Sequence, residues 1–228
     1  MTIYMTIKIV LFDFDGTIAD TLNVLLSITN RLAVEFGHKP IERSELAKIQ
    51  NLTSRQIIKY SGISILKFPF FVAKVKTELS NEIETLEAFP EIETALIELK
   101  SQLDKIGILS SNSKDNIVTF LAANNLDKLF DFIYTEAAIF SKSKVINKIL
   151  KLENIKPEEC IYVGDETRDI VAAKRSHVKA IAVSWGFNSK EVLARQNPDF
   201  LIHQPTELID IVQKLQTNDS KHSTKIKL

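Results

Sequence analysis

Residues 7–17 read Ile-Lys-Ile-Val-Leu-Phe-Asp-Phe-Asp-Gly-Thr, and this stretch decides the fold. Its first six residues are nearly continuously apolar, which is typical of a strand buried on both faces of a parallel sheet. Two carboxylates follow directly, at Asp13 and Asp15, and Gly16 then allows the backbone to turn sharply. We therefore expect a buried strand that ends in a pair of acids.

Short apolar runs and amphipathic segments alternate along most of the remaining chain. The runs that we interpret as further strands are 106–109, 132–134, 160–163, 180–183 and 200–202. Helical periodicity lies between them, at about 91–103, 115–124, 144–153, 168–175 and 190–195. Such alternation predicts βαβ units with right-handed crossovers. The expected fold class is therefore α/β with a mostly parallel sheet.

One segment, from about 20 to 86, breaks this alternation because it contains no convincing strand. Apolar positions from Leu22 to Phe36 fall on one helical face, and Gly37 closes that helix. Thr53 can cap a second helix, and 71–86 has the periodicity of a long third one. The expected organisation is a core of 1–19 and 87–216, a helical insertion of 20–86, and a polar, disordered tail of 217–228.

The composition gives no sign of a nucleic-acid or membrane partner. The 29 Lys and Arg residues balance 29 Asp and Glu residues, so the formal net charge is zero. The apolar run at 7–12 is too short to cross a membrane. Cys160 is the only cysteine in the sequence, which excludes an internal disulfide and fits a reducing, cytoplasmic setting. Both a monomer and a homodimer are compatible with this composition.

The two acids after the first strand predict metal-assisted phosphoryl chemistry. Carboxylates two residues apart repel each other in a low dielectric, and a divalent cation removes that cost. A hard cation such as Mg²⁺ takes oxygen ligands and also binds phosphate. One carboxylate could then attack phosphorus while the other acts as general acid and base. The alternative is a strand that ends in solvated acids.

Polar side chains also follow the strands at 106–109 and 132–134. Ser110, Ser111 and Asn112 offer hydroxyl and backbone N–H groups for phosphate oxygens, although this stretch could equally cap the following helix. Lys142, with Lys144 close behind, lies at the start of a predicted helix, where a cation opposes the helix dipole. It could neutralise a transferring phosphoryl group, whereas taken alone it reads as a surface lysine.

The stretch 164–169, Gly-Asp-Glu-Thr-Arg-Asp, follows the strand at 160–163. Asp165 and Asp169 can complete a Mg²⁺ site, directly or through water, although acids also favour the first turn of a helix. The strand ends together supply a nucleophile, an acid and base, metal ligands, a hydroxyl and a cation. Phosphoryl transfer needs this set of groups.

In chain order, these residues resemble the four motifs of the haloacid dehalogenase-like superfamily, over a stretch from Ile7 to about Val183. The motif D-x-D-x-T/V is matched by Asp13 to Thr17, and the hydroxyl motif by Ser111, with Ser110 as the alternative register. The lysine motif is matched by Lys142 and the motif G-D-x-x-x-D by 164–169. The resemblance implies a Rossmann-like core with a helical cap inserted after the first motif. Residues 15–21 and 184–187 look most like the phosphoglycolate phosphatase and β-phosphoglucomutase branch.

The resemblance also implies a role for each residue. Asp13 forms an aspartyl-phosphate, and Asp15 protonates the leaving group and then activates water. Lys142 and Ser111 hold the phosphoryl oxygens. The implied substrate site also includes Thr17 and Asn112, and the implied Mg²⁺ ligands are Asp13, the backbone carbonyl of Asp15 and Asp165, with Asp169 supporting the metal shell.

The expected function is Mg²⁺-dependent hydrolysis of a small phosphorylated metabolite, phosphoglycolate-like or a sugar phosphate. A phosphosugar mutase would use the same residues and stays an open alternative. Dehalogenation is disfavoured because true dehalogenases lack the acid found here at Asp15. Arg55 and Lys59, four residues apart on a predicted helix, could bind a substrate carboxylate or a second phosphate, or could form a solvated helix face.

Two alternative functions from other protein classes fit the sequence less well than a phosphatase. A signalling receiver domain also phosphorylates an aspartate beside Mg²⁺, but its acceptor ends the third strand and its chain is about half as long. A non-catalytic binding protein on the same fold would be expected to have lost Asp13 or Asp15, and both are present.

Overall fold

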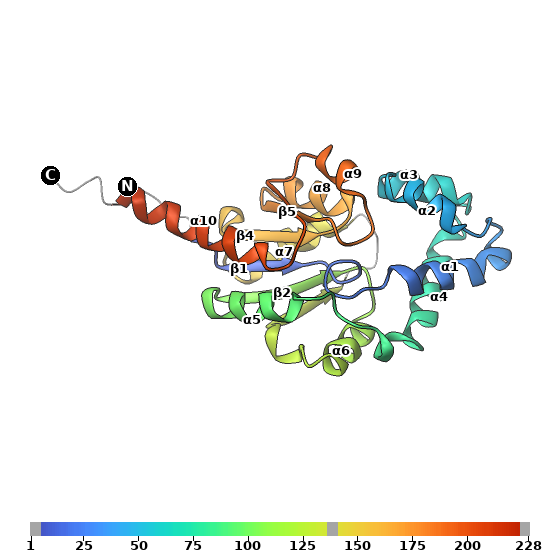
Figure 1. The fold of residues 1–228 in the computed structure, drawn as a ribbon, viewed down its shortest axis with the longest axis horizontal. Coiled ribbons are helices and arrows are strands. Elements are labelled where there is room, and N and C mark those ends of the chain that lie inside the picture. Colours follow the sequence, from blue (N-terminus) through green and yellow to red (C-terminus); the bar gives the residue numbers. More distant parts are fainter. Residues whose placement is uncertain (1–5, 136–140, 224–228) are drawn as a thin grey trace.

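A computed structural model, which describes residues 6–135 and 141–223, places six parallel strands in one sheet (Figure 1). The spatial order is β3-β2-β1-β4-β5-β6. The bounds are β1 Ile9–Phe12, β2 Lys105–Ser110, β3 Phe132–Thr135, β4 Cys160–Gly164, β5 Lys179–Val183 and β6 Phe200–Ile202. The first strand lies in the centre, paired with β2 and β4. The predicted α/β class and parallel sheet are confirmed.

Helices cover both faces of the sheet, which explains why its strands are continuously apolar. Val10 and Phe12 of β1 face one side, with α5 (Ile92–Gln102), α6 (Lys114–Ala123) and α10 (Glu207–Ser223). Ile9 and Leu11 face the other, with α7 (Lys142–Leu152), α8 (Thr167–Arg175) and α9 (Lys190–Ala194). Every side chain of β1 is therefore buried, and no alternation of apolar and polar residues arises.

The segment from 20 to 86 forms helices and turns beyond one end of the sheet (Figure 1). It contains α1 (Leu22–Phe36), α2 (Arg43–Gln50), α3 (Ser54–Ser61), α4 (Phe68–Ser80) and the short 3₁₀ helix η1 (Ile83–Thr85). As predicted, α1 ends at Gly37, whose φ of 73° is left-handed. The Thr53 side chain also caps α3, by accepting from the Gln56 backbone N–H.

Three predicted boundaries differ from the structure. The third helix begins three residues earlier than expected, with Pro69 in its first turn, and ends at Ser80 rather than at 86. The apolar periodicity of the sequence extends to Leu86 because Ile83 of η1 and Leu86, which follows η1, also pack on the core. The helix α2 was not predicted, since Ile49 is its only buried residue. The expected tail is helical to Ser223, and 224–228 lie outside the described residues.

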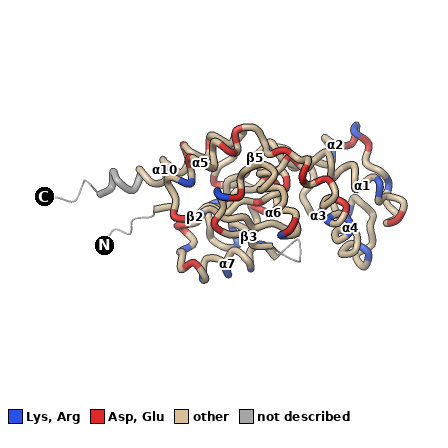
Figure 2. Tube along the Cα trace, turned by 90° about the horizontal axis from the view of Figure 1, so that it is seen from below, with Lys and Arg blue, Asp and Glu red and all other residues tan. Residues whose placement is uncertain are grey.

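Acidic and basic positions are interspersed along the trace (Figure 2). No helix in the described ranges is long and apolar enough to cross a membrane.

Candidate active site

The acids predicted from the sequence meet at the carboxyl edge of the sheet. Asp13 directly follows β1, and its backbone N–H donates to the Val163 carbonyl of β4 at 2.8 Å. Asp165 directly follows β4, and Asp169 lies in the first turn of α8. The parallel pairing of β1 with β4 thus brings together residues separated by about 150 positions in the chain.

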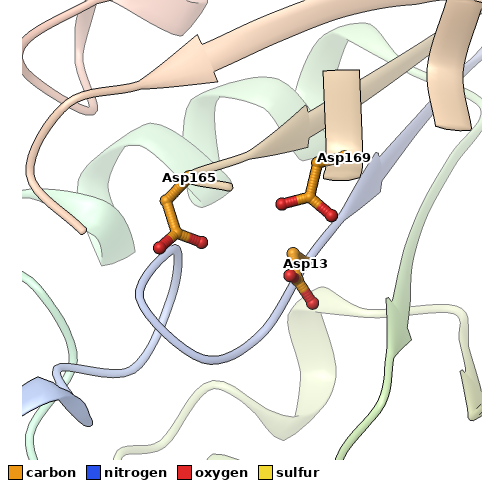
Figure 3. A group of neighbouring side chains, drawn as sticks. All are labelled: Asp13, Asp165 and Asp169. Carbon is orange, nitrogen blue, oxygen red and sulfur yellow. The ribbon is translucent and has the colours of Figure 1, made fainter. Parts of the chain in front are cut away.

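Figure 3 shows the carboxylates of Asp13, Asp165 and Asp169 directed into one small space. One carboxylate oxygen from each lies within 4.8 Å of the others, and all three residues are at most 1% exposed. The backbone at Gly16 and Gly164 lies so close to these carboxylates that a larger residue would not fit at either position. A Cβ on Gly164 would lie 2.6 Å from the Asp169 side chain, and one on Gly16, at a φ of 74°, would lie 2.2 Å from Asp165.

Asp165 is held by two donors. Its Oδ1 accepts from the Thr17 hydroxyl at 2.9 Å, and its Oδ2 accepts from the Phe187 backbone N–H at 2.7 Å. Burial, together with the nearby charges of Glu166, Asp169 and Asp13, raises the pKa of Asp165 well above its usual value. A carboxylate in this position favours a bound cation.

Lys142 is the cation that faces this cluster. Its Nζ lies 2.6 Å from Asp13 Oδ2 and also pairs with Asp169, and the residue is 1% exposed. Burial alone would lower the pKa of the Lys142 ammonium, but Asp13 and Asp169 outweigh it and hold that pKa well above its usual value. Asp169 also accepts from the Glu166 backbone N–H at 2.9 Å, and burial raises its pKa to about 7.

Asp15 is separate from the three clustered carboxylates. The Asn112 side-chain amide donates to both of its carboxylate oxygens, at 3.1 Å each. Burial, followed by the charge of Asp13, raises the pKa of Asp15 to about 7. A carboxyl group of this kind can carry a proton near neutral pH and release it during a reaction.

The two candidate serines have different surroundings. The Ser110 hydroxyl is fully buried and accepts the Asn112 backbone N–H at 3.0 Å, so it stabilises the turn. The Ser111 hydroxyl instead lies 3.4 and 3.5 Å from the Nη1 and Nη2 atoms of Arg168. Ser113 supplies the cap of α6. The Ser110 hydroxyl is thus engaged within the turn, whereas the Ser111 hydroxyl faces Arg168.

The helical insertion reaches the same edge of the core. A cavity of about 280 Å³ is lined by Arg55 and its neighbours in α3 and also by Lys142 and Arg168 of the core. Arg55 itself is exposed and lies near the start of α3. Arg55 of the insertion and Lys142 of the core thus line one cavity, whose described lining does not include Asp13, Asp15 or Asp165. Thr17 is more remote from an open surface, because its buried hydroxyl contacts Asp165.

Four side chains to which the sequence assigned no role in the site complete this region. Arg168 and Glu166 form an ion pair at the start of α8, and the Ser54 hydroxyl of α3 donates to Glu166 at 2.9 Å. Asn188 donates to the carbonyls of Gln50 and Leu52 and accepts the Thr167 backbone N–H. Arg168, like Lys142, is a cation at the start of a helix, and this position is visible in the sequence. The sequence contains no comparable indication of a role for Asn188.

Comparisons with known proteins agree on the family. The model of the haloacid dehalogenase-like hydrolases matches residues 10–183. A phosphoglycolate phosphatase from Synechococcus elongatus is 35% identical over 206 residues, which cover 90% of this chain and 97% of that protein. The pyrophosphatase PpaX of Bacillus mycoides is 25% identical over 92% of this chain and 99% of its own length. A solved haloacid dehalogenase-like hydrolase from Streptococcus pneumoniae superposes with a TM-score of 0.73 at 22% identity, covering 90% of this chain and 98% of that one.

Proposed function

This chain belongs to the haloacid dehalogenase-like hydrolase family, and from that membership we propose that it is a Mg²⁺-dependent phosphatase. Its substrate is a small phosphomonoester such as phosphoglycolate, and its intermediate is an aspartyl-phosphate. The observation that carries the proposal is the meeting of Asp13, Asp165, Asp169 and Lys142 in one buried cluster, with Asp15 beside it. The 35% identical relative supports the choice of substrate.

The three clustered carboxylates fit a hard divalent cation. Acids that are buried so close together repel one another, and Lys142 alone compensates only part of their charge. We assign Mg²⁺ to Asp13, Asp165 and the backbone carbonyl of Asp15, with Asp169 supporting the site. When bound, the ion supplies positive charge to these carboxylates and to phosphoryl oxygens.

Asp13 acts as the nucleophile in this proposal. One of its carboxylate oxygens forms a bond to phosphorus while the bond from phosphorus to the leaving oxygen breaks. Its Oδ1 accepts the Phe14 backbone N–H at 2.8 Å, and its Oδ2 lies beside Lys142. These contacts fix the carboxylate in one orientation before the ester arrives, which lowers the cost of reaching the attacking geometry.

Asp15 moves the protons of both steps. Its carboxyl group donates a proton to the leaving oxygen, and the resulting carboxylate then takes a proton from the water that attacks the aspartyl-phosphate. A pKa of about 7 allows both directions near neutral pH, and Asn112 holds the group in place. Lys142 and the Ser111 hydroxyl bind phosphoryl oxygens.

The helical insertion of 20–86 acts as a cap in this account. Arg55 lines the cavity between α3 and the core, so it is the cap residue that we assign to the leaving group of the ester. Thr17 contributes indirectly, because its hydroxyl orients Asp165. Contacts such as that of Asn188 with Gln50 and Leu52 hold the cap against the core and exclude water from the site.

The proposal is tested by measuring phosphate release from 2-phosphoglycolate, a hexose phosphate, pyrophosphate and p-nitrophenyl phosphate, with Mg²⁺ or with EDTA. We expect release that requires Mg²⁺ and that Asp13→Asn abolishes. An isomeric sugar phosphate formed instead of free phosphate would favour a phosphosugar mutase. Release that persists in Asp13→Asn would exclude the proposed nucleophile.

A further inference from the structure

Arg168 is a largely buried cation to which the mechanism above gives no role. Its side chain is 11% exposed and extends from the first turn of α8. One edge of the guanidinium binds Glu166, with Nε at 2.9 Å and Nη2 at 2.5 Å from Oε1. The other edge faces the Ser111 hydroxyl, at 3.4 Å from Nη1 and 3.5 Å from Nη2.

The surroundings of Arg168 act on its charge in both directions: burial and the helix start oppose it, whereas the carboxylates of Glu166, Asp13 and Asp169 stabilise it. The start of a helix repels positive charge, and a guanidinium removed from water loses much of its hydration. Arg168 also lines the same cavity as Lys142, a second positive charge. Glu166 balances one edge, but the contacts with Ser111 are too long to be strong hydrogen bonds. An anion beside Ser111 would give the N–H groups of the facing edge a close acceptor.

We propose that Arg168 is a phosphoryl-binding residue, which donates from Nη1 and Nη2 to the non-reacting phosphoryl oxygen that the Ser111 hydroxyl also binds. This inference rests on the proposed function, because it needs a phosphoryl group at Ser111. Lys142 already pairs with Asp13 and Asp169, whereas Arg168 has only long contacts toward Ser111, and its Nη2 has a second N–H beside the one that binds Glu166. A planar guanidinium suits this role because its parallel N–H groups match the oxygens of a phosphate.

Glu166 is the positioning residue for this guanidinium. Its Oε1 accepts from Arg168, and its Oε2 accepts from the Ser54 hydroxyl at the start of α3. The carboxylate therefore fixes Arg168 from the core and is itself fixed from the helical insertion. Removal of the Glu166 charge is expected to weaken phosphoryl binding through Arg168, without changing the attacking group.

The test compares Arg168→Gln and Arg168→Lys with wild type and with Lys174→Gln. Lys174 is an exposed cation of the same helix that does not itself line the cavity, so its variant removes an equal charge, together with one hydrogen bond to the Gln196 carbonyl. For Arg168→Gln we expect KM for every ester, and the inhibition constant of inorganic phosphate, to rise together by about tenfold or more. Arg168→Lys keeps the charge and loses the planar fork, so a smaller rise is expected; Lys174→Gln should stay within about twofold.

Three outcomes separate the possibilities. An inactive wild-type enzyme would overturn the proposed function itself, and with it this inference. An active wild type, with folded Arg168 variants whose KM and phosphate inhibition are unchanged, would overturn the role of Arg168 alone. A rise confined to esters with an anionic leaving group, with phosphate inhibition unchanged, would also overturn it and would place Arg168 on the leaving group. If Arg168→Gln does not fold, Arg168→Lys decides by the same two constants.

Discussion

Replacement of Lys142 by methionine is the most informative perturbation of the buried cluster. Methionine nearly matches the length of lysine but leaves Asp13 and Asp169 without their ammonium partner. Removing one member of a buried ion pair costs about 3–5 kcal/mol, because the remaining charge stays buried and unpaired. For a chain of this size about 1 kcal/mol corresponds to a shift of roughly 2–4 °C in Tm, so we expect Tm to fall by roughly 6–20 °C.

The assay is thermal unfolding followed by circular dichroism in EDTA at pH 8. Lys144→Met is the matched control, because Lys144 lies on the same helix but is exposed. A surface substitution of this kind changes stability by at most about 0.5 kcal/mol, or roughly 2 °C. The loss in Lys142→Met should shrink at pH 5, because Asp169, whose pKa burial raises to about 7, can take up a proton there in place of the missing cation.

A shift in Lys142→Met as small as that of Lys144→Met would refute the reasoning, because it would mean that the carboxylates do not depend on Lys142. Activity gives a second readout. Loss of one preorganised charge at a phosphoryl group is expected to lower kcat by about 10²–10³-fold.

Three further predictions follow from individual contacts. Folding raises the pKa values of Asp15 and Asp169 to about 7, so in the metal-free protein these groups stabilise the fold below about pH 4 and lose that effect as pH rises through 7. Mg²⁺ should therefore raise Tm more at pH 8 than at pH 5. An equal rise in Tm at both pH values would contradict the metal site. Asn112→Ala should lower kcat by about tenfold or more with little change in KM, because Asp15 loses both amide contacts; steady-state kinetics showing an effect on KM alone would argue against this. Asn188→Ala should cost about 1–3 kcal/mol in urea unfolding, since it removes the hydrogen-bond partner of the Leu52 carbonyl and of the Thr167 N–H, and a cost near zero would show that this contact does not hold the cap.

Much of the fold was predictable because its strongest signals are local. A strand buried on both faces, such as 9–12, needs apolar residues at every position, and the next residue out of the sheet is Asp13. The helix at 22–36 likewise carries an apolar stripe and a glycine at its end. By contrast, α2 has one buried residue and no stripe, so its formation depends on contacts that periodicity does not record.

The candidate site was predictable to the extent that its residues follow strands. Because parallel strands end at one edge, Asp13, Asp165 and the Ser111 turn could be placed together before any coordinates were known. The contact of Ser54 with Glu166 joins residues 112 positions apart, and Ser54 lies in the helical insertion rather than at a strand end. A contact of this kind leaves no pattern in the sequence, and for this reason the roles of Glu166 and Asn188 emerged only from the structure, whereas Arg168 shares with Lys142 the signal of a cation at a helix start.

The central claim is that Asp13 carries the phosphoryl group, and trapping this intermediate tests it most directly. Asp15→Asn removes the base that activates water, so the aspartyl-phosphate should accumulate when this variant is mixed with Mg²⁺ and a radiolabelled ester whose leaving group needs no proton. After an acid quench, we predict a hydroxylamine-sensitive label on the peptide that contains Asp13, and none in the variant that also carries Asp13→Asn. A label on another residue, or an unlabelled protein that still releases phosphate, would contradict the account.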